Sequence, residues 1–300
     1  MIPIVFHSLY SVGIQRGGIT RRTKYATLFD RIKPLADTDP IRILEPVPAS
    51  FAMLSAIHDP TYVRAVQDLT LSDAALRRIG FSRVPEVFSR PALSSGGSLL
   101  AAKAALDFGV GFNLAGGSHH AHRDFGSGYC VFNDVAVAAR ALLDQDRVRR
   151  ITILDLDVHQ GDGTATLFAG DPRVTTISVH GEKNFPARKA RSDLDINLPK
   201  GTGDIDYMAA VTQSLDAIDR SEKPDILFYN AGVDIMETDK LGHLSVSPAG
   251  LRAREEAVFT FAQQRGIPIV LVLGGGYDDD KDRLAGHHMV AYHTALALFP

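Results

Sequence analysis

The alternation of short β-branched runs with helical stretches is the feature that most constrains the fold of this chain. The runs expected to be strands lie at residues 2–6, 109–115, 151–156, 174–179, 225–231 and 267–273. Helical patterns occur at residues 60–69, 96–109, 134–144, 205–218 and 247–266. Several runs are apolar at nearly every position, as strands buried on both faces are. The pattern predicts an α/β fold of three αβα layers, in which helices cover both faces of a mostly parallel central sheet.

Composition narrows the class of protein. No internal repeat, low-complexity tract or composition break divides the chain, so we expect a single domain over residues 1–300. Its 32 basic and 35 acidic residues nearly balance, which argues against binding to nucleic acid or to an anionic membrane. No apolar stretch is long enough to span a bilayer, and the N-terminus lacks the basic start of a signal peptide. The one cysteine, Cys130, excludes an intramolecular disulfide, and we expect a cytoplasmic protein.

Reactive side chains follow four of the expected strands, at the carboxyl end of each. They are His119 and His120 after the run at 109–115, Asp157 and His159 after 151–156, Asp234 after 225–231, and Tyr277 after 267–273. In an open parallel sheet the ligand crevice lies outside the carboxyl ends of the strands. These residues are far apart in the sequence, but this fold would bring them to one rim.

The segment ILDLDVHQGDG, at residues 153–163, has the spacing of a metal site. Asp155, Asp157 and His159 alternate with apolar residues, so in an extended chain the three polar groups point to one face. Buried charges of this kind need a cation or a rich hydrogen-bond network. One imidazole with carboxylates suits zinc, and a site with three protein ligands leaves a position for water. Asp234, arriving from another strand, is the expected third ligand.

Each motif taken alone also fits a purely structural role. The Asp-x-Asp-x-His segment can be a turn-stabilising network, and Asp234 after a glycine can cap a turn or helix. One histidine of the adjacent pair can be a packing residue bonded to a backbone carbonyl. Tyr277 can cap the end of the sheet, and Tyr129 can be a core aromatic. The presence of four such strand ends in one chain favours the metal-site interpretation.

An ordered set of segments supports a family resemblance. They lie within residues 116–280 and are GGSHHAHRDFGSGYCVFNDVAVA, LDLDVHQGDGT, ISVHGEKNFP, NAGVDIMETDKLGHLSVS and LGGGYDDD. With these segments the chain resembles the zinc-dependent histone deacetylase family, which has the arginase/deacetylase fold. The compact length and the short LGGGY turn are most similar to bacterial proteins related to class IV deacetylases. Family members often have four glycines before the tyrosine where this chain has three. Their acidic rim residue has no clear match in this chain, and Glu86 is a weak candidate for it.

The resemblance implies a role for each matched position. The zinc ligands it implies are Asp157, His159 and Asp234. The tandem catalytic histidines are His119 and His120, paired with Asp155 and Asp162 respectively, and the catalytic tyrosine is Tyr277. The acyl-lysine channel is lined by Gly128, Tyr129 and Phe185. An inner monovalent-cation site, with potassium as the expected ion, uses Asp155, Asp157, His159, Ser178 and the backbone of Val179. We expect His122 to be a loop residue that supports the site.

The activity implied by the resemblance is hydrolysis of the amide in an acylated lysine or a related amine such as an acetylpolyamine. One zinc ion per chain activates a water molecule, and His120 takes its proton as general base. His119 stays charged beside Asp155, and Tyr277 donates a hydrogen bond to the developing oxyanion.

Three other functions are compatible with parts of the pattern. A ureohydrolase such as arginase binds two manganese ions, and it needs more Asp and His ligands than SHHAH and NAGVD supply. A non-catalytic binder of acyl-lysine or polyamines would have lost a catalytic group, and none is lost here. A cysteine hydrolase would depend on Cys130.

Overall fold

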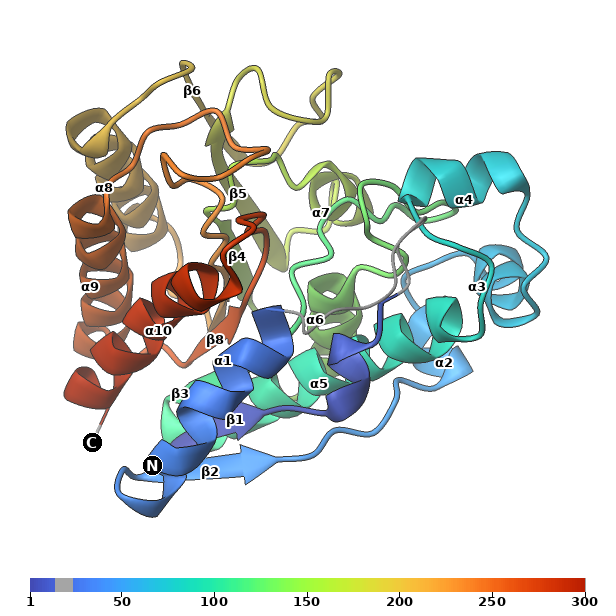
Figure 1. The fold of residues 1–300 in the computed structure, drawn as a ribbon, viewed down its shortest axis with the longest axis horizontal. Coiled ribbons are helices and arrows are strands. Elements are labelled where there is room, and N and C mark those ends of the chain that lie inside the picture. The colour runs from blue at the N-terminus through green and yellow to red at the C-terminus, as the bar shows by residue number, and fades with distance from the viewer. Residues whose placement is uncertain (14–23, 300) are drawn as a thin grey trace.

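The computed structural model describes residues 1–13 and 24–299, and its strands form one sheet (Figure 1). The strands are β1 (Ile2–Val5), β2 (Ile41–Leu44), β3 (Val110–Asn113), β4 (Ile151–Asp155), β5 (Val174–Gly181), β6 (Leu194–Leu198), β7 (Ile226–Asn230) and β8 (Ile269–Val272). Their order across the sheet is β2-β1-β3-β8-β7-β4-β5-β6, and every pairing between neighbours is parallel. The predicted parallel sheet is therefore confirmed.

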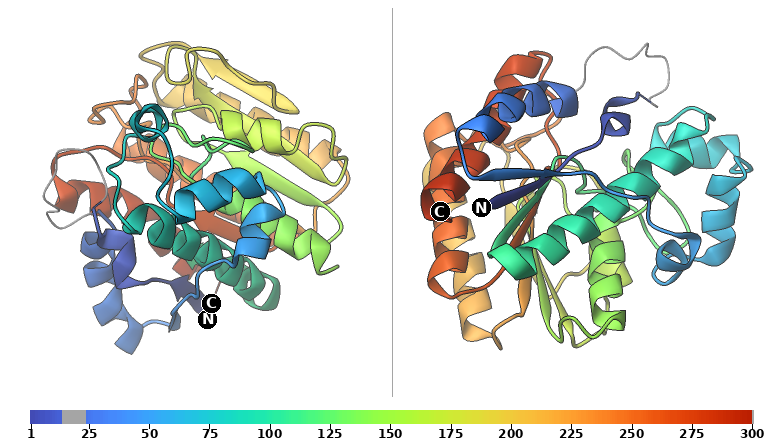
Figure 2. Two further views of the ribbon diagram at one scale, coloured as in Figure 1. Left: turned by 90° about the vertical axis from the view of Figure 1, so that its right-hand side faces the viewer. Right: turned by 90° about the horizontal axis from the view of Figure 1, so that it is seen from below.

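Helices cover both faces of the sheet. The α-helices are α1 (Lys24–Ile32), α2 (Phe51–Ser55), α3 (Pro60–Gln67), α4 (Asp73–Ile79), α5 (Glu86–Phe108), α6 (Asp134–Asp144), α7 (Asp162–Leu167), α8 (Asp204–Arg220), α9 (Pro248–Gln264) and α10 (Lys281–Leu298). Viewed from below, α1, α8, α9 and α10 lie on one side of the sheet, and α5 and α6 on the other (Figure 2). Within the described residues, no helix combines the length and the apolarity that crossing a bilayer requires.

The apolar strands contribute side chains to two separate hydrophobic cores, one on each face of the sheet. In β8, Ile269 and Leu271 belong to the core that includes residues of α8, α9 and α10. The residues between and after them, Val270 and Val272, belong to the core that includes residues of α5 and α6. Successive side chains of a strand point to opposite faces, so a strand covered on both sides must be apolar at every position. This is why the central runs were recognisable in the sequence.

The four strands that precede the reactive residues are neighbours at the centre of the sheet. Their last residues are paired in one row, in which Asn113 of β3 faces Val272 of β8, Val272 faces Asn230 of β7, and Asn230 faces Asp155 of β4. All four strands therefore end at the same edge of the sheet, and the loops that follow them begin side by side. The expectation that these strand ends share one rim is confirmed by this register.

Some elements differ from the sequence expectation. The edge strands β2 and β6 were not expected, and both have partly exposed positions that break the apolar pattern. The helix expected from residue 96 begins at Glu86 and continues through Pro91. Glycine and serine at residues 94–98 weaken the helical pattern there, and all five are buried in the packed helix. Helix α10 was also not predicted. Its first residues are polar and follow directly on the acidic residues of the expected turn, so the start of the helix could not be distinguished from the turn.

Candidate active site

The histidine pair lies on a loop that turns sharply after β3. Gly116 and Gly117 both adopt left-handed backbone conformations, with φ of 84° and 83°. A Cβ atom on Gly117 would lie 2.5 Å from Oδ1 of Asn230, so only glycine fits this turn. Asp134, in the first turn of α6, accepts a hydrogen bond of 2.8 Å from the backbone N–H of Ser118. The loop is thus held against the rim of the sheet, and it places both imidazoles there.

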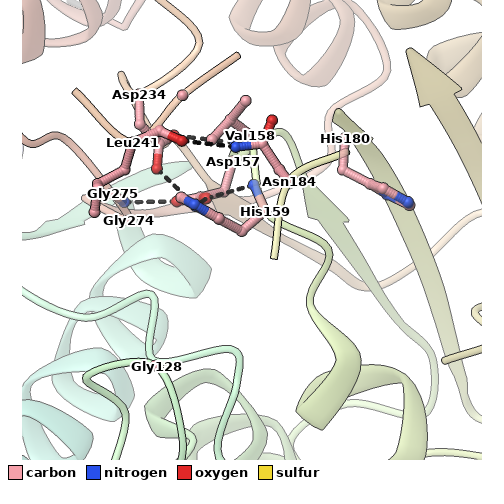
Figure 3. A network of polar contacts seen from close by, with 12 residues as sticks. Gly128, Asp157, Val158, His159, His180, Asn184, Asp234, Leu241, Gly274 and Gly275 are labelled. Carbon is pink, nitrogen blue, oxygen red and sulfur yellow. Dashed lines mark hydrogen bonds and ion pairs between the residues drawn. The ribbon is translucent and has the colours of Figure 1, made fainter. Parts of the chain in front are cut away.

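Asp157, His159 and Asp234 come together as a buried group (Figure 3). Nδ1 of His159 lies 3.0 Å from Oδ1 of Asp157 and 3.1 Å from Oδ2 of Asp234. One nitrogen or oxygen of each residue lies within 4.8 Å of the others, which allows all three to hold one metal ion. Tetrahedral zinc with bonds of about 2.0–2.2 Å requires ligand atoms roughly 3.3 Å apart. The three side chains are close to that arrangement.

Backbone amides hold the two carboxylates in place. The N–H of Gly275, in the turn after β8, donates to Oδ2 of Asp157 at 2.6 Å. The N–H of Val158 donates to Oδ1 of Asp234 at 3.0 Å. A Cβ atom on Gly275 would lie 1.8 Å from Oδ2 of Asp234, so the turn can approach only with glycine at this position. These bonds orient each carboxylate and leave its other oxygen facing His159.

The electrostatics of this group favour a cation. Burial alone would lower the pKa of His159, but its hydrogen bonds to Asp157 and Asp234 outweigh burial and raise that pKa to about 10. Burial and the charge of Asp157 raise the pKa of Asp234 to about 6. A proton on His159 therefore lies between two carboxylates. A divalent ion that binds these residues takes the place of that proton.

His119 forms a buried ion pair with Asp155. Its Nδ1 lies 2.6 Å from Oδ2 of Asp155, whose other oxygen accepts a hydrogen bond of 2.9 Å from the side-chain amide of Asn230. Burial opposes a charge on His119, but the negative charges of Asp155 and Asp157 outweigh it and raise the pKa of His119 to about 9. This imidazole is cationic at neutral pH.

His120 lies beside it in the opposite protonation state. Its Nδ1 lies 2.6 Å from Oδ1 of Asp162, the first residue of α7. Burial and the positive charge of His119 lower the pKa of His120 to about 3, against the opposing effect of Asp162. Because an ionised carboxylate only accepts hydrogen bonds, Nδ1 of His120 carries the proton and Nε2 carries the lone pair. The two imidazole rings are 4.1 Å apart.

Two partly exposed aromatic side chains, Phe185 and Tyr129, lie close to these groups. The ring of Phe185 lies edge-on to His120, with centroids 4.8 Å apart. A Cβ atom on Gly128 would lie 2.7 Å from the His120 ring, so the loop passes directly over that imidazole. Tyr129 is 48% exposed and Phe185 is 43% exposed. The residues expected to line a channel are therefore gathered at the mouth of the site.

Tyr277 lies beside the group of Asp157, His159 and Asp234, which is called the metal-binding group from here on because its geometry allows it to hold one ion. Its ring centroid lies 6.2 Å from that of His159 and 6.2 Å from that of Tyr129. Burial, together with the charges of Asp234 and Asp157, raises the pKa of Tyr277 well above its usual value of 10.0. The phenol stays neutral and keeps its proton to donate.

The residues expected around a monovalent cation lie on two neighbouring strands and the loop that follows. Asp155 of β4 faces Ser178 of β5 in the register, and Val179 follows Ser178. Oγ of Ser178 lies 2.9 Å from Nδ1 of His180, whose side chain points away from the metal-binding group (Figure 3). Potassium at this position stays a prediction.

Sequence reasoning missed several residues that support the site. Asn230 bonds Asp155, and Asp239 accepts a hydrogen bond of 2.7 Å from the backbone N–H of Tyr277. Arg254 of α9 is fully buried and donates to the carbonyl of Gly232 at 2.6 Å. Asn230 could have been found as the last residue of a strand that leads into the site. Asp239 and Arg254 do not follow a strand directly, and only tertiary packing brings them close to the site.

Cys130 lacks the environment of a nucleophile. Its side chain is buried, and burial raises the pKa of its thiol far above the usual range. Reactive cysteines are thiolates of lowered pKa in electropositive, partly exposed surroundings. The cysteine-hydrolase alternative therefore has no support in the structure.

Comparisons with known proteins agree with this geometry. A family model described as the histone deacetylase domain matches residues 20–293. An uncharacterized protein of Picosynechococcus sp. is 39% identical over 297 residues, which are 99% of each chain. Histone deacetylase 2 of Arabidopsis thaliana is 33% identical over 255 residues, which cover 81% of this chain and 65% of that protein.

A solved structure shows the same fold. Acetylpolyamine aminohydrolase from Burkholderia pseudomallei superposes with a TM-score of 0.78 at 21% identity, and the match covers 99% of both chains. At this identity the likeness concerns the fold, which is the arginase/deacetylase fold expected from the sequence. Resemblance to class IV members in particular stays a prediction. Because the family model spans most of its length, the chain belongs to the histone deacetylase family and is a hydrolase of the deacetylase type.

Proposed function

We propose that this protein is a zinc-dependent amidohydrolase that removes acetyl or other acyl groups from lysine side chains or from related small amines such as acetylpolyamines. The observation that carries the proposal is the convergence of a buried Asp-His-Asp group with two buried His–Asp pairs, each with a nitrogen-to-oxygen distance of 2.6 Å. Similarity to plant histone deacetylases in sequence, and to an acetylpolyamine aminohydrolase in fold, supports acylated amines as the substrate class.

Asp157, His159 and Asp234 would hold the zinc ion, and their number leaves room for water and substrate. When bound, zinc polarises the acyl carbonyl and lowers the pKa of a coordinated water to about 7. The ionised Asp162 keeps the proton of His120 on Nδ1, so Nε2 of His120 is free to accept the proton of the attacking water. His120 is therefore the general base. As the amide C–N bond breaks, one imidazole of the pair His119 and His120 gives a proton to the leaving amine.

His119 and Tyr277 stabilise negative charge as the reaction proceeds. Asp155 holds the imidazolium of His119 in place. The centroid of this positively charged ring lies 4.1 Å from the ring centroid of His120, the general base. Tyr277 donates a hydrogen bond from its phenolic O–H to the oxygen of the former carbonyl, where charge is greatest in the transition state. Gly128, Tyr129 and Phe185 form the walls that guide the aliphatic stem of the substrate to these groups. One potassium ion beside Asp155 and Ser178 is an additional expectation.

A hydrolysis panel tests this proposal. The zinc-loaded protein is assayed on acyl-lysine peptides of different chain length and on acetylpolyamines, with and without a chelator, and bound metal is counted by mass spectrometry. We expect hydrolysis of at least one class, loss of activity with the chelator, and one zinc per chain.

The variant Asp234→Asn is the matched control, since it removes one ligand charge and should lose zinc and activity together. Full zinc and full turnover in that variant would remove Asp234 from the ligand set. Two bound metals per chain would instead support the ureohydrolase alternative. Binding of acyl-lysine by the zinc-loaded parent without any turnover would support the non-catalytic alternative.

A further inference from the structure

We propose that His122 is a positioning residue, which binds the second oxygen of Asp162 and so fixes the carboxylate that orients His120. The inference rests on the proposed function, because it concerns the general base of that reaction. His122 is the third histidine of the segment SHHAH, and neither the metal-binding group nor the two His–Asp pairs include it.

Asp162 has a different imidazole at each of its oxygens. Oδ1 lies 2.6 Å from Nδ1 of His120, and Oδ2 lies 3.1 Å from Nε2 of His122. The side chain of Asp162 is only 10% exposed, so these two imidazoles are its main hydrogen-bond partners. Both imidazoles come from one loop, two residues apart. Asp162 is therefore the link between them.

The orientation of His122 is itself fixed. Its Nδ1 lies 2.8 Å from Oγ1 of Thr166, one turn along α7 from Asp162. Oγ1 of Thr166 also lies 3.0 Å from the carbonyl of Gly163, which fixes the position of the threonine side chain. The ring stacks on Phe125 with centroids 4.4 Å apart and planes 20° apart, and the guanidinium of Arg78 covers that phenylalanine. Because the ionised carboxylate of Asp162 only accepts hydrogen bonds, Nε2 of His122 is the donor to it.

This contact matters for His120 in two ways. A carboxylate held at one oxygen can rotate about its Cβ–Cγ bond, and a donor at the other oxygen removes that freedom. Burial raises the pKa of Asp162, but the hydrogen bonds from His120 and His122 outweigh it and hold that pKa well below the usual range. Asp162 thus remains an ionised acceptor. The proton of His120 then stays on Nδ1, and its Nε2 stays free and correctly aimed.

The test compares zinc-loaded His122→Ala and His122→Gln with the parent. We expect His122→Ala to lower kcat by about 10-fold, within the range known for groups that orient an active-site ligand, with KM changed less than about twofold and zinc content unchanged. His122→Gln places an amide N–H near the position of Nε2, and we expect it to restore kcat to within about threefold of the parent. A glutamine variant as impaired as the alanine variant would contradict the proposal.

A double-mutant cycle separates positioning from general support of the fold. In the Asp162→Asn background, His122→Ala should cost less than about twofold, because the carboxylate it acts through is already gone. In the Asp155→Asn background it should cost the full 10-fold, because His122 does not contact Asp155. Equal losses in both backgrounds would make His122 a structural loop residue and overturn the inference.

A readout without turnover keeps this test independent of the proposed function. In protein labelled with ¹⁵N-histidine, the proton shared by His120 and Asp162 is assigned by its loss in Asp162→Asn. We expect its resonance to shift in His122→Ala and to return in His122→Gln. If the parent hydrolyses no substrate but the shift is seen, the proposed function fails and the positioning contact stands. An unshifted resonance in His122→Ala overturns the positioning contact whatever the activity.

Discussion

Tyr277 stands beside the metal-binding group as a neutral phenol, since burial and the charges of Asp234 and Asp157 raise its pKa well above 10.0. We predict that Tyr277→Phe lowers kcat by about 100- to 1000-fold, because loss of one oxyanion donor costs about 2.7–4 kcal/mol in the transition state. The ring and its packing are kept, so zinc content and KM should change little. Single-turnover rates and metal content of the variant and the parent provide the measurement.

Tyr129→Phe is the matched control for this residue. Tyr129 also carries a phenol near the site, but it is 48% exposed at the mouth, and we expect its variant to keep a rate within a few-fold of the parent. If both variants keep normal rates, the three-glycine turn presents Tyr277 differently from our proposal, and another group donates to the oxyanion.

At the level of residues, the sequence was informative where a ligand set is local. The spacing of two predicted that Asp155, Asp157 and His159 share one face of an extended chain. The strand ends at Asp155, however, and residues 157–159 form a bend, so Asp157 and His159 join Asp234 while Asp155 pairs with His119. The contact between Asp239 and the backbone of Tyr277 joins positions 38 residues apart, and no spacing rule specifies it. The contribution of His122 likewise depends on the start of α7, whose first residue is Asp162.

His58 connects several elements near the loop that carries His119, His120 and His122. It follows α2, its Nδ1 lies 2.8 Å from the carbonyl of His122, and its Nε2 accepts a hydrogen bond of 3.0 Å from the N–H of Asn133, the N-cap of α6. Because one nitrogen donates and the other accepts, the ring must be neutral. Burial lowers the pKa of His58 to about 4, and the positive charge of Arg123 contributes in the same direction.

We therefore predict that acid destabilises the protein through His58. Between pH 6.5 and 4 the unfolded chain binds a proton that folded His58 does not, so stability is lost as pH falls through this window. At pH 5 the loss amounts to about 2 kcal/mol. Urea unfolding of the parent and of His58→Gln at pH 7 and pH 5 measures it. The glutamine variant should lose less stability over the same interval, and equal losses in both proteins would refute the assignment.

Helices and strands could be predicted from the sequence where their burial determines which positions are apolar. Central strands such as β4 and β8 are apolar throughout because helices cover both faces. The edge strand β2 has exposed positions, and α10 has a weakly amphipathic sequence that gives little periodicity. The order of the strands across the sheet was not predicted. Only the meeting of the four strand ends at one rim was inferred, from the general rule for parallel sheets.

At the scale of the whole molecule, the metal-binding group joins the three central strands. Asp157 follows β4, Asp234 follows β7, and the turn after β8 donates the N–H of Gly275 to Asp157. Two carboxylates buried this close repel each other unless a cation lies between them, so a bound ion should stabilise the folded chain as well as serve the reaction. An ion that binds only the folded state at 1,000 times its Kd contributes about 4 kcal/mol.

Removal of zinc should therefore lower the thermal midpoint of the parent by roughly 10 °C, given about 2–4 °C per kcal/mol for a chain of this size. Far-UV circular dichroism at 25 °C should stay unchanged, because the two cores on either face of the sheet do not depend on the ion. One equivalent of zinc should restore the midpoint. Asp234→Asn should show no response to chelator or to added zinc, since its site lacks a ligand charge. A parent that holds one zinc by mass spectrometry yet melts at the same temperature with and without chelator would show that the strand ends are held together by their backbone hydrogen bonds alone.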